Sequence, residues 1–440
     1  MLQTFKNAWK VPELKSKILF TLMILLLYRV GANLYVPYVN VDLIEQISFS
    51  NTALEFLSLI SGGALAQASF FALSVSPYIT ASIVIQLLTV AIPALERLSK
   101  EGEEGKKKLT KYTRILTVVL SVVTAYGYVK LLSNYGGFNY LLFSKADGFL
   151  YYFAMIVMIA CFCAGASIIM WMAEQIDARG IGNGISMILF ANIISGFGMT
   201  ATELYYMVIS ESTVLGYVLA GVKILISLVL TVAAIGFIVW FTNSERRIPI
   251  QYAKRVVGRK MYGGQASNLP LKLNMAGVMP VIFASSIVSI PATIAGFTGG
   301  KFATWVSKWL GQVSPIYIVL NIALILLFSY FYIMISFNPI EVSNNIRSQG
   351  GSVPGIRPGK PTADYIKKIL NRITLLGAIF LLVIQVVPMI INAILVACNV
   401  SFTSLAFTGT SLLIVVGVAL ETVRDMEAQL AMRNYKGFLD

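Results

Sequence analysis

The sequence contains no histidine, few cysteines and little charge. Of its 440 residues none is His, three are Cys and 12% are charged. Without His, imidazole is excluded as a general base, as a metal ligand and as a pH switch. Cys161, Cys163 and Cys398 are too few, and too apolar in their surroundings, to form a disulfide framework or a zinc site. We interpret Cys161 and Cys163 as packing residues.

The motifs of common catalytic sites are missing as well. The chain has no Walker A sequence, no HExxH pair and no GxSxG elbow. The stretch GIGNGIS at 180–186 resembles a phosphate loop, but no Lys-Ser or Lys-Thr follows it. We interpret this stretch as a flexible, close-packed entry to a helix. The sequence therefore predicts a protein that is not an enzyme and that has no cofactor.

Long apolar runs dominate what is present. Hydrophobic residues make up 57% of the chain and its mean hydropathy is +0.78, values that soluble domains do not reach. We predict an all-α polytopic membrane protein with ten transmembrane helices. Ten apolar windows approach the roughly 20 residues that a helix needs to cross a bilayer, at 18–36, 75–93, 113–132, 149–172, 184–205, 214–240, 275–296, 315–337, 372–391 and 404–420.

The segment 1–17 differs from the rest of the N-terminal region. It places Trp9, Val11 and Leu14 among lysines, a pattern that suits a short amphipathic helix on the membrane face. The apolar run that follows is long, carries Arg29 and lacks a small-residue cleavage site. It predicts a first spanning helix and not a removable signal peptide.

The basic residues fix the predicted orientation, because Lys and Arg beside short loops stay on the cytoplasmic side. With the N-terminus inside, the cytoplasmic segments hold 28 Lys and Arg, and the outer loops hold four. An even number of spans then places both termini in the cytoplasm.

Ten spans divide into an N-terminal half at 18–210 and a C-terminal half at 211–420, with a cytoplasmic tail at 421–440. Halves of five spans run in opposite directions, which is the requirement for an inverted repeat with a functional site between the halves. No residue-level repeat relates the two halves, so the prediction of two inverted five-helix halves depends on the topology.

Carboxylates are almost absent from the ten windows. The exception, Glu203, lies two residues from the outer end of its window. Two other functions stay open, a small-solute transporter and a channel-less scaffold or insertase. Ion-coupled carriers usually need intramembrane carboxylates, so the scarcity of carboxylates counts against the transporter. Arg29 and Lys223 lie near the outer ends of their spans, where their side chains can reach the interface, and we interpret them as structural.

Two predicted cytoplasmic loops, 243–274 and 338–372, are longer and more basic than topology requires. The first combines arginines with a β-compatible stretch and a glycine turn. The second contains PGIRPG, whose prolines and glycines predict a tight exposed tip around Arg357. These charges have two interpretations. They can set the topology and attract anionic lipids, or they can form a docking surface for a large polyanion or acidic protein, such as ribosomal RNA or a motor ATPase. The length of the loops favours docking.

The stretch SGGALAQASFFAL at 61–73 is apolar but short. As a helix it would rise roughly 20 Å, against roughly 30 Å of bilayer hydrocarbon, so it cannot cross. Its small residues predict a short, weakly packed helix that leaves its site at low cost. A buried re-entrant segment without a gating role is the alternative.

Six long stretches carry a family resemblance: SGGALAQASFFALSVSPYITASIVIQLLTV, KEGEEGKKKLTKYTR, EQIDARGIGNGISMILFANII, QYAKRVVGRKMYGGQASNLPLKLNMAGVMPVIFASS, FNPIEVSNNIRSQGGSVPGIRPG and GTSLLIVVGVALETVRDMEAQL. Together they resemble the bacterial SecY family, the large subunit of the Sec protein-conducting channel or translocon. The resemblance covers nearly the whole chain, and the outer loops at 37–56, 133–148 and 297–314 match least.

The resemblance implies a channel for unfolded polypeptides in the cytoplasmic membrane of a bacterium, with two halves around an hourglass pore and a side exit into lipid. It implies that 61–73 folds back as a plug, whose leading residues are Ser61, Gly62, Gly63, Ala64, Leu65, Ala66 and Gln67. It also implies an apolar pore ring made of Ile79, Ile83, Leu189, Ile282 and Ile414. Leu189 departs from a strict isoleucine ring, and we expect this to be tolerated because girth and apolarity matter more than branching.

The same resemblance implies a lateral gate between the second and seventh spans. Its polar seam is expected from Thr80, Ser82, Gln86, Ser285 and Ser286. Arg259, Lys260 and Arg357 take the places of family residues that engage the ribosome or the SecA motor ATPase. The implied partners also include SecE-like and SecG-like small membrane subunits, signal peptides and nascent preproteins, and the energy is expected to come from translation or from an ATPase.

Overall fold

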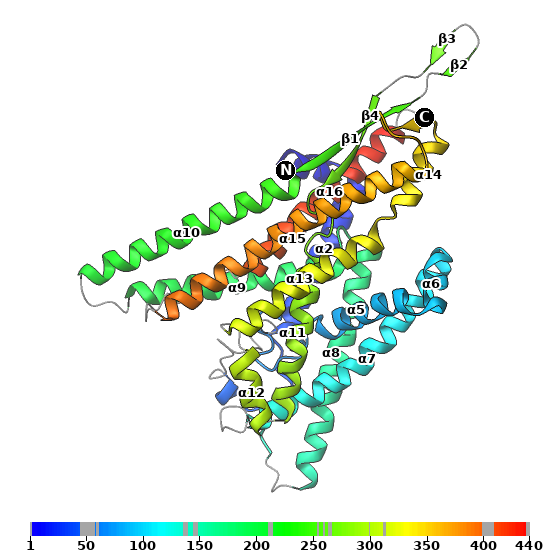
Figure 1. Cartoon of the computed structure of the whole chain (residues 1–440). Coiled ribbons are helices and arrows are strands. Elements are labelled where there is room, and N and C mark those ends of the chain that lie inside the picture. Colours follow the sequence, from blue (N-terminus) through cyan, green and yellow to red (C-terminus); the bar gives the residue numbers. More distant parts are fainter. Residues whose placement is uncertain are drawn as a thin grey trace.

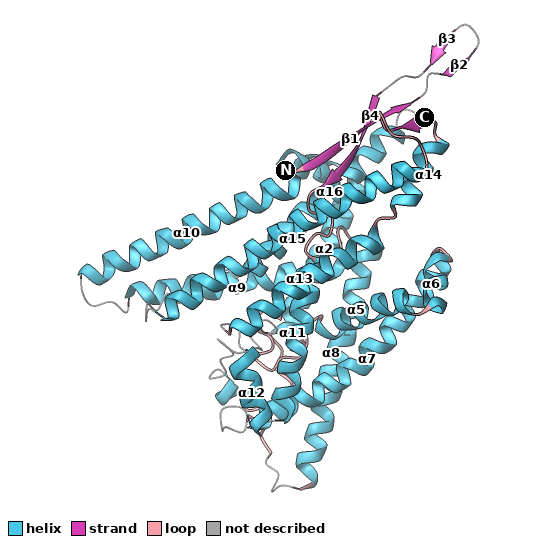
Figure 2. Ribbon diagram, in the orientation of Figure 1, coloured by secondary structure: helices cyan, strands magenta, loops and turns pink. Residues whose placement is uncertain are grey.

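The protein is described here from a computed structural model. It describes residues 2–44, 58, 61–134, 140–143, 148–209, 214–252, 255–257, 260–262, 266–298, 300–310, 314–397 and 409–436. Long helices run through most of the molecule, and a small group of strands stands at one end of it (Figure 1). Figure 2 shows that the strands are confined to that end.

Each of the ten predicted apolar windows overlaps a long helix. These helices are α2 (Pro12–Ala32), α5 (Ser76–Ala91), α7 (Glu103–Asn134), α8 (Phe149–Arg179), α9 (Gly184–Ile209), α10 (Val214–Asn243), α11 (Met279–Thr298), α13 (Pro315–Ser336), α15 (Lys360–Ala397) and α16 (Gly409–Lys436).

Several of these helices are long and apolar enough to cross a membrane on their own. Within the described residues five meet this test, in α7, α8, α10, α13 and α15. A sixth span results if α5 is joined to α6 (Pro93–Lys100), although the two helices meet at a bend of 102°. Pro93 begins α6 and cannot donate the amide hydrogen that would continue α5. Ten spans therefore remain a prediction, whereas a polytopic helical architecture is established.

Shorter helices flank the long ones. They are α1 (Leu2–Lys10), α3 (Val41–Ile44), α12 (Gly300–Leu310) and α14 (Pro339–Ser348). The predicted amphipathic segment 1–17 is divided between α1 and the start of α2, and α1 packs on α16, where Thr4 Oγ1 donates to Glu427 Oε1 at 3.0 Å. Ala8 is fully buried in this contact, beside Val423 and Met426. The first helix and the last helix therefore meet at the end of the molecule that carries the strands (Figure 1).

The two predicted cytoplasmic loops join in one small sheet. Its strand order is β4-β1-β5, with β1 (Glu245–Tyr252) antiparallel to β4 (Ala266–Lys272) in the register Ile248 opposite Leu269. Strand β5 (Gly351–Ser352), from the second loop, pairs with the end of β1. A separate pair, β2 (Arg255–Val257) and β3 (Lys260–Tyr262), extends the hairpin. The predicted β-compatible stretch is confirmed.

This sheet has a hydrophobic core of its own. The members of that core come from β1, β4, α14, α15 and the residue that follows β5, and are Ile248, Ile250, Leu271, Ile346, Val353, Ile366, Ile369, Leu370 and Ile373. Because apolar side chains of both loops are buried together, the two loops form one packed unit.

Candidate functional site

The five predicted ring residues are brought together. Ile79 and Ile83 lie on α5, Leu189 on α9, Ile282 on α11 and Ile414 on α16. All five are at most 4% exposed and belong to one hydrophobic cluster. The spacing of four residues places Ile79 and Ile83 on one face of α5. The five residues therefore share one core with helices from both halves of the chain, and the pore ring stays a prediction.

A cavity of about 430 Å³ opens beside this cluster. Leu189, Ile282 and Ile414 form part of its wall, together with residues of α10, α13 and β4. Ile79 and Ile83 are not among the described residues that line it. The cavity therefore reaches three of the five ring residues from the side of the molecule that carries the sheet.

Charged side chains line the other part of the cavity: Lys272, Glu421, Arg424 and Asp425. Arg424 Nη2 donates to Thr242 O at 3.1 Å and to Asn243 Oδ1 at 2.8 Å, which ties α16 to the end of α10. Burial lowers the pKa of Lys272, and the nearby Arg424 lowers it further, whereas Glu245 and Glu421 act in the opposite direction.

The pKa of Glu421 is raised, first by burial and then by Asp425, with Lys272 and Arg424 opposing the shift. Burial is the first cause of both shifts, although Lys272 and Glu421 stay exposed and the surrounding residues remove only part of their water. The cavity is therefore polar and charged toward the sheet and apolar toward the ring.

The structure corrects the conformation predicted for 61–73, which we call the plug segment. The segment is a succession of turns and not a helix. Gly62, Gly63 and Ala68 have φ angles of +60°, +85° and +45°, and Ser74, the next residue after the segment, has +49°. A right-handed helix cannot continue through left-handed residues, because their amides no longer point at the carbonyl four residues back.

The prediction of weak packing is also wrong. Ser61, Ala64 and Ala68 are at most 1% exposed. Backbone bonds tie the segment to residues after α2, with Phe70 N donating to Leu34 O at 2.7 Å. Tyr128 of α7 donates its hydroxyl hydrogen to Leu65 O. Small residues here allow close backbone approach, and the result is tight packing and not looseness.

The plug segment also contacts the ring cluster. Ala64 and Phe71 belong to the same hydrophobic cluster as the five ring residues. The ring of Phe71 stacks on Tyr28 of α2 with centroids 5.4 Å apart. Segment and ring therefore share one continuous core.

Polar contacts hold both ends of the plug segment, and the sequence analysis did not find them. At its start, Arg29 Nη1 donates to Gly62 O at 3.4 Å. Just past its end, Asn192 Nδ2 donates to Tyr28 OH at 2.8 Å and to Ser74 Oγ at 3.3 Å. Arg29 is recognisable in the sequence as an intramembrane cation, but no sequence pattern indicates that its partner is Gly62. An Asn inside an apolar window was the available signal for Asn192.

The two helices of the predicted lateral gate, α5 and α11, pack against each other. Thr80, Ser82 and Gln86 are half-buried, and Ser285 and Ser286 are buried. Thr80 Oγ1 donates to Ser76 O at 3.0 Å, and Gln86 Nε2 donates to Ser82 Oγ at 3.4 Å, both within α5. The side chains of Thr80, Ser82 and Gln86 therefore bond within α5 and do not require the partner helix.

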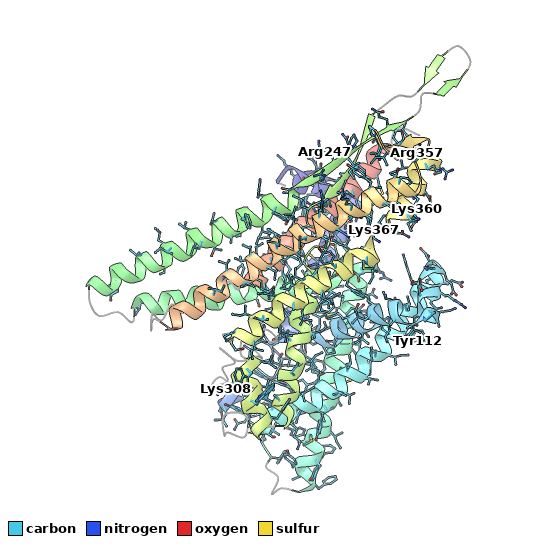
Figure 3. All side chains as sticks on the ribbon, viewed as in Figure 1. Tyr112, Arg247, Lys308, Arg357, Lys360 and Lys367 are labelled. Atoms are coloured by element: carbon cyan, nitrogen blue, oxygen red, sulfur yellow. The ribbon has the colours of Figure 1, made fainter. Side chains whose placement is uncertain are left out.

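The predicted docking residues are only partly described. Arg259 lies outside the described residues, and the backbone of Lys260 lies in β3 without a described side chain. Arg357 is exposed on a tip held by two bonds, Thr362 Oγ1 to Arg357 O at 2.9 Å and Ser343 Oγ to Gly359 O at 2.8 Å. Figure 3 shows Arg247, Arg357 and Lys360 together at the sheet end, and Lys308, on α12, far from them.

The loop at 180–184 is close-packed, as predicted, but it is also firmly held. Ile181 N donates to Thr21 Oγ1 at 3.1 Å, Gly182 N to Asp425 Oδ2 at 3.1 Å and Gly184 N to Asp177 Oδ1 at 2.7 Å. A Cβ on Gly184 would lie 2.0 Å from Ala173 O, so only glycine fits there. The loop joins α2, α8, α9 and α16 on the sheet side of the cavity.

Comparison with known proteins supports the resemblance. The family model SecY matches residues 69–423. The protein translocase subunit SecY of Streptomyces coelicolor is 43% identical over 449 residues, and that of Mycobacterium tuberculosis is 42% identical over 456 residues. In each case all of this chain and all of the relative are covered.

Solved structures share the fold at lower sequence identity. A structure described as a protein conducting channel has a TM-score of 0.66 at 17% identity, and one concerned with the SecY plug domain, which stabilises the closed state, has 0.64 at 17%. Sec61 in the canine ribosome-channel complex has a TM-score of 0.61 at 16% identity. Each alignment covers 96% of both chains. With the family model matching most of its length and full-length relatives above 40% identity, the chain belongs to the SecY family.

Proposed function

We propose that the chain is the central channel subunit of a Sec translocon. It passes unfolded secretory polypeptides across the cytoplasmic membrane and releases hydrophobic segments sideways into lipid. One observation carries this proposal above all: Ile79, Ile83, Leu189, Ile282 and Ile414, from four helices, belong to a single buried cluster. This cluster also includes Ala64 and Phe71 of the plug segment, and three of the five residues line the cavity with charged walls.

The chemistry of an apolar collar formed by the predicted pore ring suits the transport of a polypeptide. A narrow apolar constriction resists the passage of ions because water leaves it. It offers a passing chain neither hydrogen bonds nor charges, so it seals without selecting sequence. The charged cavity on the sheet side serves as the entrance, and the plug segment closes the pore from the other side.

Lateral release uses the seam between α5 and α11. Because Thr80 and Gln86 bond within α5, separating the two helices does not strand these polar groups. A hydrophobic signal or membrane segment then moves into lipid, driven by about 25 cal/mol for each Å² of apolar surface taken from water. Signal peptides and nascent preproteins are the expected substrates.

The sheet end is the proposed docking surface for the SecA motor and the ribosome, including its RNA. In the sequence, Arg259 and Lys260 fall in the first loop and Arg357 in the second, and the described parts of these two loops share one packed core. Sec61, a structural relative, occurs in a ribosome-channel complex, which supports a ribosomal partner. Anionic lipids are expected to contact the remaining basic residues of this face.

A SecE-like and a SecG-like membrane subunit complete the proposed complex. Helix α10 supports a partner in the membrane, since only 6% of its most apolar window is buried within this chain. Leu225, Leu228 and Val232 are each at least 60% exposed along it. Lipid and a small helical subunit both suit such a face.

Deleting residues 61–69 tests the plugged channel. We expect a standing ion conductance in planar bilayers from the full-length complex with this deletion, because the collar loses its stopper. Unchanged conductance would count against the channel and favour a scaffold. Crosslinking of a stalled preprotein to single cysteines at Ile79, Ile282 and Ile414 then tests whether the collar surrounds the translocating chain.

A further inference from the structure

Ser74 connects the plug segment to α5 in a strained conformation. Its φ of +49° lies in the left-handed region, which few residues other than Gly, Asn and Asp adopt. Such a residue persists only where its surroundings hold it, and strain of this kind often marks a switch. Ser74 is 1% exposed, so its surroundings are entirely protein.

Two buried side chains hold Ser74. Asn192 Nδ2 lies 3.3 Å from Ser74 Oγ and 2.8 Å from Tyr28 OH, and the two hydroxyl oxygens are 3.5 Å apart. Tyr28 and Asn192 are both fully buried. We call Tyr28, Ser74 and Asn192 the hinge lock. Because water cannot replace these bonds, each one favours the arrangement in which all three residues meet.

Adjacent residues of α2 hold the two ends of the plug segment. Arg29 bonds to Gly62 at the start, and Tyr28 bonds into the hinge lock at the end. The plug segment is therefore hydrogen-bonded to α2 at both of its ends.

The hinge lock lies directly beside the pore ring. Asn192 follows Leu189 by three residues on α9, so the two side chains lie on the same face of that helix. Ser74 precedes Ile79 by five residues, at the entry to α5. Any movement that separates α9 from α5 at the ring also separates Asn192 from Ser74.

We propose that the hinge lock couples widening of the ring to release of the plug segment; this rests on the channel function proposed above. When a polypeptide spreads α9 and α5, the Asn192 amide leaves Ser74, and the strained hinge lets the segment swing away. When the ring closes, the bonds form again. Tyr28 and Asn192 act as positioning residues that need no contact with the polypeptide.

The test measures resting ion conductance of the full-length complex in planar bilayers. Tyr28→Phe removes only the hydroxyl, and we expect leak to rise about 5-fold, the population change that follows from losing one net hydrogen bond. Asn192→Leu removes both bonds at similar volume and should leak more. Ser74→Ala is a third variant, which keeps the test intact should Asn192→Leu fail to accumulate.

The plug deletion 61–69 separates coupling from a general loss of structure. In that background the hinge-lock variants should add no further leak, because the element they release is already gone. Asn321→Leu is the matched control: Asn321 is 1% exposed and accepts from Gln385 Nε2 at 3.3 Å, between α13 and α15. We expect it to leave conductance unchanged.

Three results would overturn the hinge lock. If a hinge-lock variant raises the leak equally with and without residues 61–69, the leak comes from a structural defect. The same holds if Asn321→Leu raises the leak as much as the hinge-lock variants do. Leak from the plug deletion without any from Tyr28→Phe, Ser74→Ala or Asn192→Leu refutes the lock and leaves the channel function standing. Absence of leak in the plug deletion itself refutes the plugged channel, and the lock with it.

Discussion

Gly62 illustrates how much of the proposed seal depends on one residue. Its φ is +60°, and a Cβ there would lie 2.9 Å from Ser195 Oγ and 3.0 Å from Asn192 O. We predict that Gly62→Ala displaces the start of the plug segment, since a left-handed alanine costs about 1–2 kcal/mol before any clash. Planar-bilayer recordings should show leak approaching that of the plug deletion.

Gly196→Ala is the matched control for Gly62→Ala. Gly196 lies on α9, one residue after Ser195, and an added Cβ meets nothing within 4 Å. Conductance of this variant should equal that of the unaltered protein. The prediction for Gly62 fails if the two alanine variants behave alike.

Glu421 gives a prediction about pH. Burial and Asp425 raise the pKa of its carboxyl above the ordinary value of 4.5, so ionising it destabilises the folded chain. This cost is absent below pH 4.5, where the group is protonated in both states, and it grows as pH rises through the raised pKa. Glu421→Gln should therefore raise the melting temperature in detergent at pH 7 and leave it unchanged at pH 4. A lower melting temperature at pH 7 would instead show that Lys272 and Arg424 dominate.

Among whole elements, the tip around Arg357 invites a direct test of docking. Thr362 bonds to the Arg357 carbonyl and not to its side chain, so Arg357→Glu leaves the tip intact. We predict a severe loss of motor-driven secretion, because the charge that meets an acidic partner is reversed. Preprotein export into inverted membrane vesicles measures the effect. Lys107→Glu, the same reversal at an exposed residue of α7, should export far better; equal export from both variants would contradict a specific role for the tip.

The long helices were predictable from the sequence, whereas the pairing of the short strands and the turns of the plug segment were not. Helices α8 and α13 were predictable because long apolar runs must satisfy their backbone groups internally within a membrane. The hairpin of β1 and β4 was visible as a β-compatible stretch. The pairing of β1 with β5 was not predictable, because a strand of two residues has no sequence pattern of its own and is defined only by the strand it pairs with. The turns of the plug segment were missed because alanine and serine at 68 and 74 give no sign of left-handed backbone.

On the scale of the whole molecule, the orientation is open to labelling. Arg357 and Lys308 lie at opposite ends in Figure 3, and the positive-inside rule assigns Arg357 to the cytoplasm. In a chain whose native cysteines are replaced by serine, a membrane-impermeant maleimide applied to intact cells should label Lys308→Cys and spare Arg357→Cys. Inverted vesicles should give the opposite pattern, and the same labelling in both preparations would refute the orientation.

The sequence by itself determined the class of this protein. Apolar windows, the distribution of basic residues and the absence of His fix a helical membrane chain without imidazole chemistry, because each depends on composition or on local period. The tertiary structure alone decided which residues meet: the five predicted ring residues in one buried cluster, the bonds from Arg29 to Gly62 and from Asn192 to Ser74, and the charges around the cavity. The buried cluster includes residues as far as 335 positions apart in the sequence, Ile79 and Ile414, and no local pattern encodes which helix faces will pack together.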